Sequence, residues 1–232
     1  MNPEIRSSIL IPGAILLAGI VISIAVYVVR TSDPSNAQLG SPSAVRPVDP
    51  ANDHIVGNPS APVMLIEYSD TDCEYCKQFE ATLAQLMTEY GNDGKIAWVY
   101  RHFPVVEEHP NAAKNAAAAE CASRIKGENA FWSFLNAMHS TAPADQEFDP
   151  ADYGKLLPGL GIDAKLFDTC LADESVGKRV IADYTNGLEA GASGAPYTIL
   201  LVKGKNPVTI SGAVNYTSMK KIIEKSLAEA AH

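Results

Sequence analysis

Four cysteines are the residues of this sequence with the clearest chemical potential, and two of them lie close together. Cys73 and Cys76 enclose Glu74 and Tyr75 in the tetrapeptide Cys-Glu-Tyr-Cys. Two thiols at this spacing can close a disulfide within one helical turn and open it again. The thiolate is the species that attacks a disulfide or leaves one. The spacing therefore indicates thiol–disulfide exchange at Cys73 and Cys76.

The residues around this pair predict a strand that gives way to a helix. Residues 63–68 (VMLIEY) are a short apolar run typical of a buried strand, and residues 69–72 (SDTD) are turn and cap formers. A helix with one apolar face is expected over residues 73–90. Cys73 would then lie at the helix N-terminus, where unpaired N–H groups and the positive end of the dipole stabilise a thiolate.

Two other interpretations of the cysteines remain open: a zinc site built from all four thiolates, and a purely structural Cys73–Cys76 bridge. Structural zinc sites usually bring two close pairs of ligands, whereas Cys121 and Cys170 are single residues about 50 positions apart. They fall in separate predicted helices, so in an oxidising compartment we expect them to form a second disulfide. Two buried free thiols are the alternative.

Beyond the pair, the sequence alternates strands and helices. Further strands are expected over residues 95–103, 197–202 and 207–211, the last two after the Gly-Ala-Pro of residues 194–196. Helices are expected at residues 111–125, 131–139, 149–157, 163–171, 175–190 and 216–230. This order predicts an α/β fold with a helical insertion at about residues 108–192.

The N-terminal residues predict a membrane anchor. Residues 9–29 contain no charged side chain, and 21 helical residues span the roughly 30 Å hydrocarbon core of a bilayer. We expect residues 1–30 to form a cytoplasmic tip and a transmembrane signal-anchor, which makes the chain a single-pass protein of the cell membrane. A cleaved signal peptide is the alternative, because Ser35 and Ala37 form a possible small-residue cleavage site.

Amino-acid composition separates a linker from a globular domain and disfavours some binding partners. Residues 31–53 are rich in Pro, Ser, Asn and Ala, which predicts a flexible linker before a globular domain at residues 54–232. The formal net charge of −9 disfavours nucleic-acid binding. The sequence has no glycine-rich phosphate loop and no serine nucleophile elbow, so we expect no cofactor. We also expect no metal, and a monomer.

Five segments spread from about residue 57 to the C-terminus carry a family resemblance. They are GNPSAPVMLIEYSDTDCEYCKQFE, RHFPVVEEHPNAAKNAAAAECA, FWSF, FDTCLAD and GASGAPYTILLVKGK. In their order and spacing the chain resembles the DsbA family of thiol–disulfide oxidoreductases, and more closely its membrane-tethered branch. The resemblance implies a thioredoxin-like fold with a helical insertion and protein-disulfide oxidoreductase activity.

The resemblance also implies roles for individual residues. Cys73 would be the exposed nucleophile and Cys76 its buried partner. Pro196 would be a cis-proline beside the pair, and Ala195 would offer its backbone groups to an extended substrate segment. Glu67 matches a strand acid that relays a proton to or from Cys76. The alternative for Glu67 is a half-exposed strand residue without a catalytic role.

Two residues depart from the family pattern. Glu74 stands where proline is common, and a carboxylate beside Cys73 is expected to raise the pKa of its thiol and to weaken oxidising power. Glu at this position also resembles the reductive thioredoxin-like proteins of cytochrome c maturation. Ala195 replaces a usual Thr or Val, and its smaller side chain is expected to loosen control of the disulfide. With Tyr75, these residues form the expected substrate-binding surface.

The leading functional hypothesis is a disulfide donor for exported proteins with free cysteines. A quinone-coupled membrane partner of the DsbB or VKOR-like type would reoxidise it. A reductase or isomerase of exported proteins is the first alternative, and a non-catalytic assembly module is the second. The intact cysteine pair and Pro196 speak against the second. His102 and His109 are expected to have surface or capping roles rather than a place near the pair.

Overall fold

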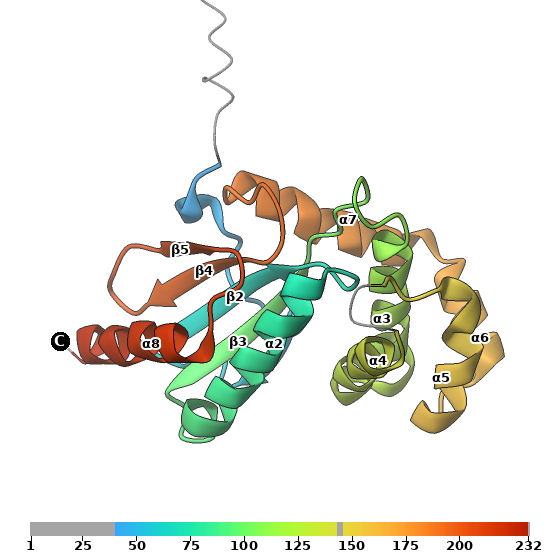
Figure 1. Ribbon diagram of the computed structural model, residues 1–232, viewed down its shortest axis with the longest axis horizontal. Coiled ribbons are helices and arrows are strands. Elements are labelled where there is room, and N and C mark those ends of the chain that lie inside the picture. Colours follow the sequence, from blue (N-terminus) through green and yellow to red (C-terminus); the bar gives the residue numbers. More distant parts are fainter. Residues whose placement is uncertain (1–39, 143–145, 232) are drawn as a thin grey trace, which may run out of the picture. The chain divides into compact units, whose positions relative to one another are not determined.

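A computed structural model describes residues 40–142 and 146–231 (Figure 1). Residues 40–231 belong to one compact unit that begins at Gly40. The anchor predicted at residues 9–29 and its alternative cleavage site lie outside the described residues. In the two described ranges, no helix is both long and apolar enough to cross a membrane.

A five-stranded sheet forms the centre of the domain, in the order β1-β3-β2-β4-β5. The parallel pair β2–β3 lies in the middle, and the other neighbours are antiparallel. The strands are β1 (His54–Gly57), β2 (Val63–Ser69), β3 (Ile96–His102), β4 (Tyr197–Val202) and β5 (Val208–Ser211). Every residue of β3 is buried, as expected for a strand covered on both faces. The thioredoxin-like α/β fold that the sequence predicts is therefore present, with β1 as an unpredicted edge strand.

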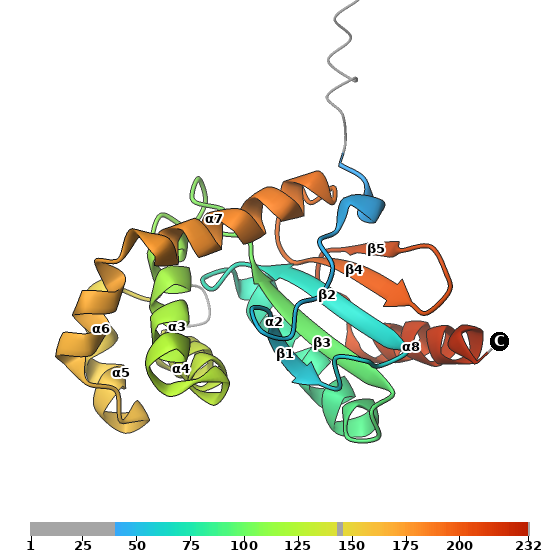
Figure 2. The same cartoon turned by 180° about the vertical axis from the view of Figure 1, so that it is seen from behind.

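Helices cover both faces of this sheet (Figures 1 and 2). Because side chains alternate along a strand, Leu65 packs with α2 (Glu74–Leu86) and α8 (Tyr216–Ala230), whereas Ile66 packs on the side of α7 (Glu174–Glu189). A π-helical turn, η3 (Met87–Gly91), continues α2. The sequence predicted one helix to residue 90, so its extent is correct and only its last turn differs.

The helical insertion lies between β3 and β4. Its elements before α7 are α3 (Ala112–Lys126), α4 (Glu128–Thr141), the short η4 (Pro150–Asp152), α5 (Tyr153–Leu160) and α6 (Ala164–Leu171). Buried alanines of α3 allow close helix packing. A disulfide joins Cys121 of α3 to Cys170 of α6, with their Cα atoms 5.8 Å apart. This bond removes the four-thiolate zinc site and the two free thiols as interpretations of these cysteines.

Residues 40–53 correct the predicted linker. They contain the short η2 (Pro42–Ala44) and lie along α7, where Ser41 N–H donates to the carbonyl of Glu189. Arg101, which is fully buried, donates to both carboxylate oxygens of Asp53 at 2.9 and 3.0 Å. The prediction of a flexible linker up to residue 53 is wrong from Gly40 onward. The prediction rested on the scarcity of apolar residues in this segment, whereas buried ion pairs fix the segment to the domain.

Candidate active site

Cys73 and Cys76 lie at the N-terminus of α2, directly after β2. Cys73 is the N-cap residue, with an extended backbone (φ −69°, ψ 123°), and Cys76 faces inward from the first turn. Neither takes part in a disulfide. Cys76 is completely buried and Cys73 is 7% exposed. Cys73 is thus the more accessible sulfur, although it is less exposed than the sequence suggested.

Asp70 holds the turn that presents the pair. Its Oδ1 accepts the N–H of Asp72 at 2.8 Å, and its Oδ2 accepts the N–H of Val105 at 2.7 Å. His109 Nδ1 lies 3.0 Å from the same Oδ2. The backbone N–H of Asp70 points at Cys76 Sγ, 3.5 Å away. The expectation that His109 lies away from the site is therefore wrong, because it supports the loop that ends at Cys73.

The two thiols differ sharply in acidity. A hydrogen bond from Cys76, opposed by burial and aided by the backbone N–H groups of Cys76 and Tyr75, lowers the pKa of the Cys73 thiol to about 6. Burial raises the pKa of Cys76 well above its ordinary value, and the neighbouring Cys73 raises it further. At neutral pH Cys73 is therefore a thiolate and Cys76 a thiol, as a nucleophile and its resolving partner require.

Glu74 does not act on Cys73 as the sequence suggested. It is exposed on the first turn of α2, and its Oε1 accepts a hydrogen bond from Gln78 Nε2 at 2.9 Å. The carboxylate thus runs along the helix surface into solvent, where water screens its charge. The expected rise in the pKa of the Cys73 thiol is therefore wrong. Hydrogen bonds from Cys76 and from the N–H groups at the start of α2 lower this pKa instead.

The loop before β4 brings Pro196 and Ala195 to the pair. The Ala195–Pro196 peptide bond is cis. The carbonyl oxygen of Ala195 lies 3.8 Å from Cys73 Sγ. Tyr75, two positions after Cys73, is 64% exposed. The site therefore combines a reactive sulfur, a backbone edge and an exposed aromatic ring, as binding of an extended peptide requires.

Glu67 is a buried carboxyl behind the pair, not a half-exposed strand residue. It is completely buried, and its Oε2 accepts the indole N–H of Trp98 at 2.8 Å. Its Oε1 has no hydrogen-bond partner among the residues that the structure describes. Burial raises the pKa of Glu67 to about 8. The group can therefore hold or release a proton near neutral pH, as a relay to Cys76 would need.

Glu80 is a second buried carboxyl that the sequence analysis missed. It lies one turn beyond Cys76 on the buried stripe of α2, and Ser69 Oγ donates to its Oε1 at 2.9 Å. Burial and then the charge of Glu67 raise the pKa of Glu80 well above its usual range. The sequence signal was a glutamate in step with Cys76, Phe79 and Leu83 on the apolar face.

His54, His102 and Glu120 form a separate buried cluster whose ligand-type atoms all lie within 4.8 Å of one another. His102 is fully buried, so its predicted surface role is wrong. Against burial, the hydrogen bonds that His54 donates to the carboxylates of Glu120 and Glu128 raise its pKa to about 9. Arg179 Nε is also 3.7 Å from Glu120. Cations thus already surround this carboxylate, and we interpret the cluster as structural ion pairs.

Comparison with known proteins places this geometry in a family. The sequence profile of the family described as Thioredoxin matches residues 50–225. The chain belongs to the thioredoxin family. The match covers both cysteines of the pair, the helical insertion and Pro196, and the predicted DsbA-like resemblance is confirmed.

Several solved structures share this fold. DsbA1 of Wolbachia pipientis superposes with a TM-score of 0.68 at 19% identity, covering 82% of this chain and 98% of that one. DsbA2 of Pseudomonas aeruginosa gives 0.64 at 22% identity, covering 77% and 96%. Oxidised BdbD of Bacillus subtilis gives 0.64 at 20% identity, covering 78% and 95%. At these identities the likeness establishes the fold alone.

Curated relatives of this thioredoxin-family chain are much longer proteins. The sequence is 37% identical over 151 residues to a protein of Salinispora arenicola named Na(+)/H(+) antiporter NhaA 1. That match covers 65% of this chain and 22% of the relative. The relative from Salinispora tropica, named NhaA 3, is 36% identical over the same length. The chain thus matches about a fifth of the length of these relatives.

Proposed function

We propose that this protein is an extracytoplasmic thiol–disulfide oxidoreductase that forms disulfides in exported proteins through Cys73 and Cys76. The observation that carries the proposal is the unequal pair at the N-terminus of α2. The lowered pKa of Cys73 makes it a good leaving thiolate, and the raised pKa of Cys76 keeps that sulfur protonated in the reduced form. A stable Cys73 thiolate favours the reduced protein and therefore the donation of disulfides.

The reaction passes through a mixed disulfide. A substrate thiolate attacks Cys73 Sγ, the Cys73–Cys76 bond breaks, and its electron pair remains on Cys76, which takes up one proton. A second substrate thiolate attacks the substrate sulfur of the mixed disulfide and releases the Cys73 thiolate. The substrate is oxidised by two electrons and the protein is reduced by two. Ala195 and Tyr75 provide the surface against which the substrate segment lies.

Reoxidation calls for an electron acceptor, and we assign it to a quinone-coupled membrane protein of the DsbB or VKOR-like type. The uncharged residues 9–29 support a single-pass membrane anchor. The Cys121–Cys170 disulfide supports an oxidising compartment.

The test is disulfide transfer to a protein. The oxidised full chain, in detergent micelles, is mixed with a reduced substrate protein that has several cysteines, and substrate disulfides are counted by mass after alkylation. We expect disulfides to appear faster than in buffer, and Cys73→Ser to abolish the gain. Equal rates with and without the oxidised chain would overturn the proposal.

A further inference from the structure

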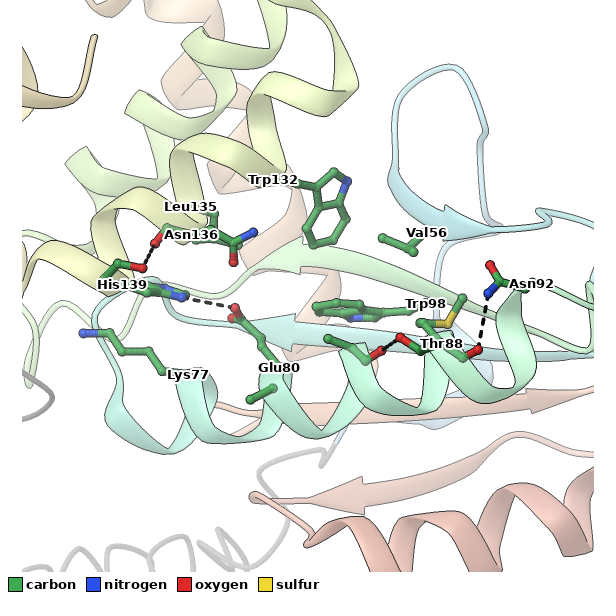
Figure 3. A pocket seen from close by; sticks show the side chains of 14 residues that line it. Val56, Lys77, Glu80, Thr88, Asn92, Trp98, Trp132, Leu135, Asn136 and His139 are labelled. Atoms are coloured by element: carbon green, nitrogen blue, oxygen red, sulfur yellow. Dashed lines mark hydrogen bonds and ion pairs between the residues drawn. The ribbon is translucent and has the colours of Figure 1, made fainter. Parts of the chain in front are cut away.

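The reactive sulfur and the backbone edge beside it are held by different parts of the chain. On the cysteine side, His139 Nε2 donates to the carbonyl oxygen of Thr71 at 3.0 Å, and its Nδ1 lies 3.5 Å from Glu80 Oε2 (Figure 3). The turn that presents the pair is thereby attached to α4 and α2. The backbone edge of Ala195 belongs to the loop of residues 190–196, between α7 and β4. The contacts of this loop therefore decide where a substrate segment meets the sulfur.

A segment before β1 covers the start of this loop. Residues 40–46, which we call the strap, cross the C-terminal end of α7 (Figures 1 and 2). The Ser41 N–H donates to the carbonyl oxygen of Glu189 at 2.8 Å. A Cβ added to Gly40 would overlap the backbone nitrogen of Gly191, and a Cβ added to Gly191 would lie 3.0 Å from the carbonyl oxygen of Gly40. The strap and the loop therefore meet backbone to backbone, which requires glycine at residue 40.

Asn186, in the last turn of α7, holds the other end of the strap. Its Nδ2 donates to the carbonyl oxygen of Ala44 at 3.1 Å, and its Oδ1 accepts the backbone N–H of Arg46 at 3.0 Å. The same Oδ1 accepts hydrogen bonds from the Tyr68 hydroxyl and from the Arg101 guanidinium. Asn186 is buried, so water competes little for these bonds. The strap is thus attached at both ends to the helix that leads into the loop.

Apolar packing connects the strap with the reactive end of the loop. Val45 packs against the buried cluster that includes Ala190 and Ala192, and Ala195 packs against the same cluster. The hydroxyl of Tyr197, which follows the loop, donates to the carbonyl oxygen of Ala190 at 3.0 Å and closes the loop on itself. A shift of the strap would therefore move the backbone edge beside the reactive sulfur.

We propose that the strap positions the Ala195 backbone for substrate binding, with Gly40 and Ser41 as its positioning residues. A substrate segment that pairs with a fixed backbone edge loses only its own freedom, whereas pairing with a mobile loop must order the loop as well. The strap therefore favours binding of an extended peptide and leaves the chemistry at Cys73 unchanged. A small thiol reacts without using the edge. The inference rests on the proposed function, since it deepens substrate binding at the same site.

One added methyl group tests this role in the full chain. Gly40→Ala places a Cβ against the backbone of α7 and should displace the strap. With the oxidised chain in detergent micelles, the second-order rate constant for reduction by a short two-cysteine peptide should fall about tenfold. The rate constant for dithiothreitol and the midpoint of thiolate absorbance at 240 nm should stay at their wild-type values. The matched control is Gly159→Ala, at an exposed position of α5 with open space around it, and it should behave as wild type.

Replacing Ser41 gives an independent test, because its side chain and its N–H can be removed separately. Ser41→Pro removes the N–H that donates to Glu189 and should slow the reaction with the peptide severalfold. Ser41→Ala keeps this N–H and should react as wild type. All variants are compared at a temperature at which each of them is folded.

Two results would overturn the proposal. If the folded Gly40→Ala and Ser41→Pro variants react with the peptide at the wild-type rate, the strap acts on stability alone. If they react more slowly with the peptide and with dithiothreitol to the same extent, the effect lies at the sulfurs and not at the edge. Failure of the proposed function differs from both, because the wild-type chain itself would then form no peptide disulfide. The same comparison would in that case use the reduced chain and a peptide that carries a disulfide.

Discussion

The sulfur of Cys73 lies 3.8 Å from the carbonyl oxygen of Ala195, the residue that the cis bond joins to Pro196. A substrate sulfur bonded to Cys73 must therefore lie beside this backbone edge. Two elements distant in sequence, the start of α2 and the loop before β4, thus form one reaction surface. Cys73 is the residue of this surface that reacts.

The first prediction concerns the order of events at the two sulfurs. When reduced Cys76→Ser is mixed with a substrate protein that carries a disulfide, the Cys73 thiolate should attack that bond, release one substrate thiolate and accumulate as a mixed disulfide, because no resolving thiol remains. Non-reducing electrophoresis after acid quenching measures the adduct. The matched control, Cys73→Ser, should form none. Adducts on Cys76 in that control would reverse the assigned roles.

The second prediction concerns the thiolate. In the reduced protein, absorbance at 240 nm should rise with a midpoint near pH 6, because Cys73 has a pKa of about 6. Because this pKa is lower in the folded than in the unfolded chain, ionisation contributes stability that grows from pH 6 to about pH 9 and is lost as pH falls through 6. The transition should vanish in Cys73→Ser. A midpoint near 8.5 would contradict the account.

The third prediction concerns Glu67. Glu67→Gln should unfold at higher temperature at pH 7, because folding raises the pKa of this carboxyl from 4.5 to about 8. A raised pKa in an acid means that stability is lost as pH rises above the unfolded value, so removing the acid stabilises by roughly 1–3 kcal/mol at pH 7. Gln keeps an acceptor for the Trp98 indole. Below pH 4 the two proteins should unfold alike, and a persistent difference there would refute this origin.

The fourth prediction concerns the segment before β1. Compared with a chain that starts at Gly40, one that starts at His54 should lose roughly 3–5 kcal/mol, because Arg101 is then buried without Asp53. Chemical denaturation measures both. A matched single change, Asp53→Ala, should cost a similar amount. If the two truncated chains were equally stable, residues 40–53 would be a linker that does not stabilise the domain.

The fifth prediction concerns the second disulfide. The double variant Cys121→Ala/Cys170→Ala should lose about 2–4 kcal/mol of stability, since the bond closes a long loop between α3 and α6. At a temperature where the variant is folded, thiol exchange at Cys73 should be unchanged. Loss of exchange in the folded variant would mean that this bond takes part in the chemistry.

The sequence could predict the redox pair, Pro196 and the fold, because spacing and hydrophobic periodicity are local signals. It could not predict Glu80, since a glutamate in an amphipathic helix is usually solvated and only burial makes it unusual. The effect of Glu74 depended on a side-chain direction that the sequence does not specify. Residues 40–53 were misinterpreted because their partners, Arg101 and Asp183, are far along the chain.

The reduction potential of the Cys73–Cys76 pair tests the central claim most directly. A Cys73 pKa of about 6 stabilises the reduced form by about 1.4 kcal/mol at pH 7, or about 30 mV for two electrons. Equilibration with glutathione should therefore give a value on the oxidising side of thioredoxin, between about −240 and about −120 mV. A value at or below about −270 mV would contradict disulfide donation and favour a reductase.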